Sequence, residues 1–130
     1  MYHRIVVGAA KTDTARRAVE VAFDPAARCG AEVHAVTVIP RTETALTSPL
    51  RRGAEAFLAA LRPPPGVGLT PHVIPGDPAD VLVMVATEVS ADLVVVGNKG
   101  MRGARRILGS VPNSVAHEAP CSVLVAQTTG

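Results

Sequence analysis

Aromatic residues, cysteines and charge of either sign are all scarce in this chain of 130 residues. It has no tryptophan, one tyrosine and two phenylalanines, so its core must be built from Val, Leu, Ile and Ala. So few aromatic rings also argue against stacking on nucleic-acid bases as a mode of binding. Cys29 and Cys121 lie far apart and show neither a metal-ligand nor a redox spacing, so we expect free thiols.

The charge balance excludes further classes of partner. Thirteen basic and eleven acidic residues leave a formal net charge of +2, too weak to favour nucleic acid or an anionic membrane. No apolar run approaches the roughly 18–20 residues of a membrane span, and no signal-peptide pattern is present. We therefore expect one cytoplasmic domain over residues 1–130 that binds neither nucleic acid nor a membrane.

Patterns typical of catalysis and metal binding are missing too. The four histidines are scattered, without HxH or HxxxH spacing, which disfavours a metal site. There is no GxSxG nucleophile elbow, no GxxxxGK[ST] P-loop and no evident pair of carboxylates for acid–base work. The sequence therefore does not predict an enzyme.

Apolar runs alternate with amphipathic stretches along the chain. Such alternation predicts an α/β domain with a doubly wound parallel sheet and helices on both faces. The expected strands are 4–7, 32–39, 69–74, 93–96 and 122–126. The expected helices run from Asp13 to Gly30, Ser48 to Leu61, Asp77 to Val89 and about Val111 to Glu118.

Local signals support these helices, with one conflict. Ser48 before Pro49 and Asp77 before Pro78 are both N-cap residues followed by proline at the first helical position. Pro25 is the conflict, because proline inside a helix costs about 3 kcal/mol. We expect either a kink near residues 23–24 or a break at which Asp24 caps a short second piece.

The stretch 91–127 carries the clearest chemistry. An apolar strand ends at Gly97, and a loop rich in glycine and basic residues leads to Ser110, a good N-cap, with Pro112 in the first helical turn. Glycines let backbone N–H groups approach a ligand, and a helix N-terminus attracts negative charge. This combination suits a phosphate chain. The alternative is that the glycines only turn the chain and the basic residues form a solvated surface.

The ordered set of motifs resembles the universal stress protein family. GNKG at 97–100 is followed, after eight residues, by GSV at 109–111 and then by APCSVLV at 119–125. RIVVG at 4–8, TARRAVEVA at 14–22 and GDPADVL at 76–82 add further matches, so that only 41–68 lies outside the resemblance. The resemblance implies five parallel strands in the order 3-2-1-4-5. In this order the chain reverses between strands one and four, and ligands bind at their carboxyl ends.

Family members with the glycine signature bind adenine nucleotides, usually ATP, and the resemblance implies the same here. It places Val38 beside adenine, and Gly8 and Ala9 at the border of the base. Glycines 97 and 100 would lie under the ribose and phosphates, and residues 109–111 would hold the phosphates. The complete set of candidates is Gly8, Ala9, Ala10, Val38, Val96, Gly97, Lys99, Gly100, Arg102, Gly109, Ser110 and Val111. The implied cofactor is ATP or another adenine nucleotide, with or without Mg²⁺.

Two departures from the family pattern concern the ligand. The spacing between Gly100 and Gly109 is one residue shorter than usual, and Ala10 stands where the family has an aspartate that can contact the nucleotide. Losing one hydrogen bond costs about 0.5–1.5 kcal/mol, or roughly 2- to 12-fold in affinity. Lys11, the next residue, would favour an extra phosphate or another anion.

Three functions follow from this pattern. The first is a regulatory stress-response protein that binds ATP, AMP or cyclic AMP without strong catalysis. The second is a dimeric interaction module of the same fold that binds nucleotide weakly or not at all. The resemblance implies a homodimer, and we expect residues 122–126 to be the edge strand through which it forms. The third, a slow ATP hydrolase or phosphotransferase, has no motif in its favour.

Overall fold

Five apolar runs form the strands of one parallel sheet in this computed structural model, which describes residues 2–9, 13–98 and 110–127. The elements in chain order are β1 (Arg4–Gly8), α1 (Asp13–Cys29), β2 (Glu32–Ile39), α2 (Pro49–Ala59), β3 (Leu69–Pro75), α3 (Pro78–Glu88), β4 (Leu93–Gly97), α4 (Ser110–Glu118) and β5 (Ser122–Ala126). The strand order is β3-β2-β1-β4-β5, and the four strand pairs are parallel. The predicted fold class and strand order are therefore confirmed.

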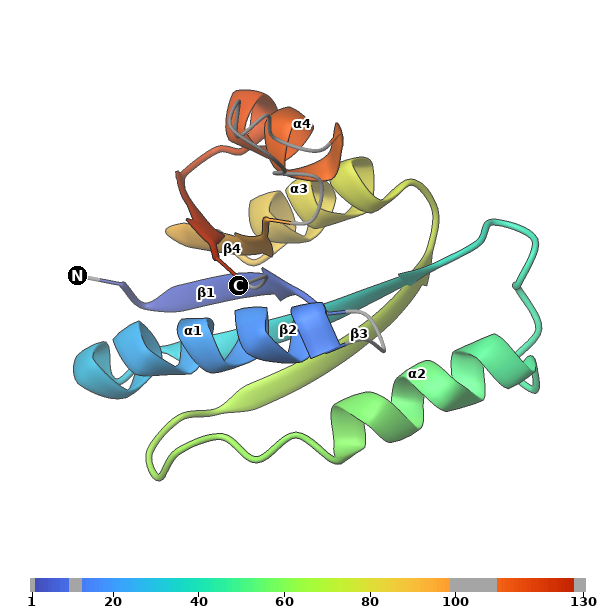
Figure 1. Cartoon of the computed structure of the whole chain (residues 1–130), viewed down its shortest axis with the longest axis horizontal. Coiled ribbons are helices and arrows are strands. Elements are labelled where there is room, and N and C mark those ends of the chain that lie inside the picture. The colour runs from blue at the N-terminus through green and yellow to red at the C-terminus, as the bar shows by residue number, and fades with distance from the viewer. Residues whose placement is uncertain (1, 10–12, 99–109, 128–130) are drawn as a thin grey trace.

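The central strands are buried on both faces, which is why they are continuously apolar. On β1, Ile5 and Val7 face one apolar cluster, which includes residues of α1 and α2, and Val6 faces a second cluster, which includes residues of α3 and α4. Figure 1 shows the two helix pairs on opposite faces of the sheet. The core is thus a two-sided packing of aliphatic side chains, as the composition predicts.

Helix α1 corrects one expectation. It runs unbroken from Asp13 to Cys29 with Pro25 inside it, so the predicted break with a second, capped piece is wrong. Ala22 and Ala26, on either side of the proline, are fully buried against the sheet, and this packing offsets the local cost. Asp24 forms an ion pair with Arg28 at 3.3 Å instead of capping a helix.

The helix ends follow the sequence signals closely. The Ser48 hydroxyl accepts a hydrogen bond from Arg51 N, and the Asp77 carboxylate accepts one from Asp80 N, which confirms both N-caps. Helix α2 ends at Ala59, before the predicted Leu61, consistent with the bias against helical backbone just before Pro63. Helix α4 differs slightly from expectation, because Ser110 is its first residue rather than the residue before it.

The part of the chain that the structure describes contains no helix with both the length and the apolar character needed to cross a bilayer.

Candidate functional site at the carboxyl edge of the sheet

The order in which the chain adds strands reverses between β1 and β4, and Gly8, Val96 and Gly97 lie at the carboxyl ends of these two strands. The chain places β2 and β3 on one side of β1, and β4 and β5 on the other. Val7 is paired with Val95, so β1 and β4 end next to each other at Gly8 and Gly97. A sheet of this order leaves a crevice outside these ends, and such crevices are where α/β proteins bind ligands.

Gly8 lets α3 pack closely against the end of β1. A Cβ atom built at Gly8 would lie 3.2 Å from Leu82 Cδ1, tighter than most real contacts. Without a side chain at this position, Leu82 can lie against the backbone at the half-buried end of β1.

The backbone of Ala9 is already engaged by the protein. Its N–H donates a hydrogen bond to the Val36 carbonyl at 2.7 Å, which extends the β1–β2 ladder by one residue. Ala9 is also only 3% exposed. A ligand at this edge therefore cannot use the Ala9 N–H group as a hydrogen-bond donor.

Val38 and Val96 differ in their exposure. Val38, near the end of β2, is half-buried beside the apolar cluster under α3, so part of its side chain faces outward. Val96 is buried within the same cluster and supports the site from beneath. Gly97 is half-buried and pairs with Ala126, and Asn98, which follows it, is a buried polar residue that sequence reasoning did not single out.

The start of α4 lies at this same edge. Because α4 is part of the crossover between the parallel strands β4 and β5, it runs antiparallel to them, and its first turn comes back to their carboxyl ends. No acidic residue occupies that first turn, so its positive end is not neutralised from within the helix. Val111 is half-buried and packs on the core, which fixes the helix start in place.

The remaining candidates are Ala10, Lys99, Gly100, Arg102 and Gly109, and these five lie outside the described residues. The contribution of the glycine-rich loop therefore stays a prediction.

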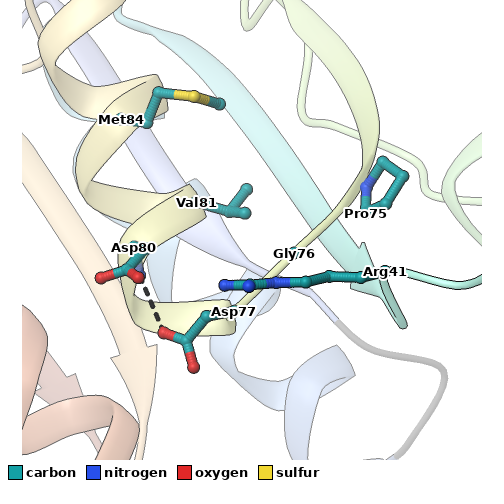
Figure 2. A pocket seen from close by; sticks show the side chains of 7 residues that line it. All are labelled: Arg41, Pro75, Gly76, Asp77, Asp80, Val81 and Met84. Atoms are coloured by element: carbon teal, nitrogen blue, oxygen red, sulfur yellow. Dashed lines mark hydrogen bonds between the residues drawn. The ribbon is translucent and has the colours of Figure 1, made fainter.

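A cavity of about 350 Å³ lies along the same edge, at the ends of β2 and β3 rather than of β1 and β4. Gly76 N donates to the Ile39 carbonyl at 3.0 Å and ties the turn after β3 to the end of β2. Figure 2 shows the Arg41 side chain extended toward the first turn of α3. The cavity is lined by Arg41, Pro75, Gly76, Asp77, Asp80, Val81 and Met84.

None of these cavity residues was predicted as a site residue. The sequence GDP at 76–78 was interpreted only as a helix cap, a role that Asp77 does fill. The signal that would have found the cavity is the strand order itself, since β2 and β3 end side by side and Arg41 follows β2 closely. The charged lining is mixed, with the Arg41 guanidinium beside the carboxylates of Asp77 and Asp80, and the volume suits a small ligand.

Metal ligation finds little support in residues 2–9, 13–98 and 110–127. No group of three or more His, Cys, Asp or Glu side chains in these residues is placed to hold a metal ion.

Comparison with known proteins identifies the family. The family model for the universal stress protein family matches residues 1–127. This chain belongs to the universal stress protein family. Universal stress protein Rv1636 of Mycobacterium tuberculosis is 31% identical to this universal stress protein over an alignment of 143 positions that covers 98% of each chain.

Solved structures of similar proteins share the fold. The crystal structure of a universal stress protein in complex with cAMP is 34% identical to this chain, covers 98% of both chains and has a TM-score of 0.74. The universal stress protein from Archaeoglobus fulgidus in complex with dAMP is 25% identical, covers 95% of this chain and 97% of its own, and has a TM-score of 0.73. Both of those proteins were therefore solved with an adenine nucleotide.

Proposed function

We propose that this universal stress protein binds an adenine nucleotide at the carboxyl edge of its sheet and acts as a regulator rather than an enzyme. The observation that carries this proposal is the reversal of strand order, which brings Gly8, Gly97 and the first turn of α4 to one edge. The cAMP and dAMP complexes of two related proteins support adenine as the base.

The charges at this edge indicate how a bound nucleotide is oriented. The first turn of α4 is the positive end of a helix and carries no acidic residue, so we infer that the phosphates lie there. Val38, half-buried and apolar, suits the base. The cavity beyond it carries the two carboxylates of Asp77 and Asp80 against one guanidinium, that of Arg41, so its side chains attract phosphates less than the start of α4 does, which opposes the reverse orientation.

ATP, AMP and cyclic AMP all fit this proposal. The Ala9 N–H group is used by the protein, and Ala10 supplies no carboxylate for the ribose. We therefore expect the phosphates to contribute more to affinity than the sugar does. The sequence contains no P-loop and no evident general base, so we propose that bound ATP is held without appreciable hydrolysis.

Nucleotide binding is expected to stabilise the protein measurably. A ligand present at about 100 times its Kd raises the free energy of unfolding by about 2.7 kcal/mol, so thermal unfolding with ATP, AMP or cyclic AMP detects it. Ser110→Ala removes the hydroxyl at the start of α4 and is expected to weaken ATP binding by roughly 2- to 12-fold in calorimetry.

Ser114→Ala is the matched control, since it removes the same group one turn later in the same helix and should leave the affinity unchanged. Adenosine, which lacks phosphates, should not distinguish Ser110→Ala from the wild type. If none of the three nucleotides shifts the unfolding temperature, the proposed function is wrong and the interaction module becomes the better account.

The interaction module is the second candidate function, and the two sheet edges favour it as a homodimer through β5. Edge strands expose unpaired backbone groups that a second chain can join. The β3 edge contains Pro71 and Pro75, which cannot donate to a ladder, whereas β5 has no proline and its Leu124 is 39% exposed. We infer that self-association, where it occurs, uses Ser122–Ala126.

Light scattering at micromolar concentration is expected to give a dimer mass for the wild type. Leu124→Glu should shift the equilibrium toward monomer, because it places a carboxylate on the apolar part of that edge. Leu46→Glu, on an exposed residue outside the strands, controls for the added charge and should leave the mass unchanged. A monomeric wild type, or equal effects of both substitutions, would reject β5 as the interface.

A further inference from the structure

A row of polar side chains crosses three strands, from the amino ends of β1 and β2 to the middle of β3, away from the candidate nucleotide site. His34 Nδ1 lies 2.9 Å from His72 Nε2, and His34 Nε2 lies 3.1 Å from Glu32 Oε1. The same carboxylate oxygen is 3.5 Å from Arg4 Nε. The row thus joins β1, β2 and β3, and its only direct link to β3 is the contact between the two imidazole rings.

This contact is part-buried. On β2, Val33 and Ala35 face the cluster under α1 and α2, so His34 faces the other side, beside Val36 and α3. His34 is 8% exposed and His72 is half-buried, with the ring centroids 5.2 Å apart. The pair is therefore a part-buried polar contact in which the His34 ring has little access to water and depends on its protein partners.

The hydrogen-bond geometry fixes where protons can sit. Neutral His34 donates from Nε2 to the Glu32 carboxylate, so its Nδ1 has a free lone pair and accepts from His72 Nε2–H. The pair can accept one added proton without losing this hydrogen bond, because His72 can bind the proton on Nδ1 and still donate from Nε2. A second added proton would break the hydrogen bond, since both facing nitrogens would then carry hydrogen and both rings would be positive.

We propose that the His34–His72 pair is a proton-sensitive lock that releases the edge strand β3 when the pair takes up a second proton. The strand depends on this lock more than a central strand would, because it has β2 as its single strand neighbour and two prolines interrupt its outer edge. This inference does not depend on nucleotide binding.

The charged groups around the pair set the direction of its pH dependence. Burial and the neighbouring His34 lower the pKa of His72, while the carboxylate of Glu88, at the end of α3, acts to raise it. Arg4 from β1 offsets the charge of Glu32. On the side of β4, the Asp92 carboxylate accepts hydrogen bonds from the backbone N–H groups of His3 and Arg4.

The direction of the pH dependence follows from the geometry of the pair, which accepts one added proton but not two, and it agrees with the lowered pKa of His72. The unfolded chain binds protons with the ordinary histidine pKa of about 6.5, so it takes up more protons than the folded protein as the pH falls below that value. The stability present above about pH 6.5 is then lost progressively as the pH falls toward the lowered pKa of His72.

Thermal unfolding of the full chain between pH 7.5 and pH 5 tests this lock. The wild-type Tm should fall by about 2–8 °C more than that of His72→Gln, which keeps a hydrogen-bonding side chain but cannot be protonated. His117→Gln, on the exposed side of α4, is the matched control and should follow the wild type. Equal pH profiles for the wild type and a folded His72→Gln would overturn the proposal.

A second measurement uses the wild type alone, in case His72→Gln does not fold. NMR titration of the imidazole signals should show the pKa of His72 below the ordinary histidine value. Amide exchange in β3, corrected for its intrinsic pH dependence, should rise about 10-fold or more relative to β4 as the pH falls from 7.5 to 5. An ordinary pKa for His72 together with unchanged β3 exchange would overturn the proposal.

Discussion

Phe57→Ala is expected to lower the free energy of unfolding by about 3–5 kcal/mol, a large part of the stability of a domain of this size. The chain has only two phenylalanines, and Phe57 carries the apolar face of α2 into the core at 8% exposure. Its neighbour Leu58 is the other large side chain that α2 buries there. Arg16 of α1 lies over the ring, with its guanidinium carbon 5.8 Å from the ring centroid. Removing the ring therefore leaves a cavity between α2, α1 and the sheet and weakens the attachment of α2.

Leu50→Ala provides the control within the same helix. Leu50 is 51% exposed, so its truncation should change the free energy of unfolding by no more than about 0.5 kcal/mol. Urea unfolding followed by circular dichroism measures both variants. Comparable losses for the two substitutions would show that α2 is not held by the face that the structure buries.

Gly76→Ala is the second large effect, with an expected loss of about 2–4 kcal/mol in the free energy of unfolding. Gly76 has a φ of +152°, a backbone conformation that L side chains rarely adopt. A Cβ atom there would lie 2.7 Å from Val81 Cγ2. Val81 is buried and β-branched, so it cannot easily turn away. Both effects act on the turn that joins β3 to α3 and lines the cavity.

Gly68→Ala is the matched control at the other end of β3. The nearest atom to a Cβ there is Glu32 Cβ at 3.9 Å, an ordinary contact, and its φ is not positive. This substitution should be neutral or stabilise the protein by up to about 1 kcal/mol, because alanine restricts the unfolded chain. The difference between the two variants in chemical denaturation isolates the backbone requirement at Gly76. A Gly76→Ala protein as stable as Gly68→Ala would contradict the account of this turn.

Much of the fold was predictable because its signals are local. Buried parallel strands are short apolar runs ended by glycine or proline, and Ser48 and Asp77 mark helix starts by their own hydrogen bonds. The strand order came from the family resemblance and not from these patterns. The break that was one of the two alternatives at Pro25 is absent, because the packing of the buried alanines outweighs the local preference of proline against helix interiors.

The site was less predictable because it depends on register between strands. That Gly8 and Gly97 share an edge follows from the strand order, but the use of the Ala9 N–H by Val36 depends on the alignment of β1 with β2. The same is true of the contact between His34 and His72, which are separated by 38 positions and showed no motif spacing. The cavity at Arg41 likewise requires knowing how two loops meet in space.

Amide NMR during titration with ATP, AMP and cyclic AMP tests the central claim most directly. The account predicts chemical-shift changes that saturate and are largest at Gly8, Gly97 and Val111, with smaller changes at Val38. The amides of Ser122–Ala126 should change little by comparison. An absence of shifts at millimolar nucleotide, or shifts confined to residues far from the carboxyl ends of β1 and β4, would contradict it.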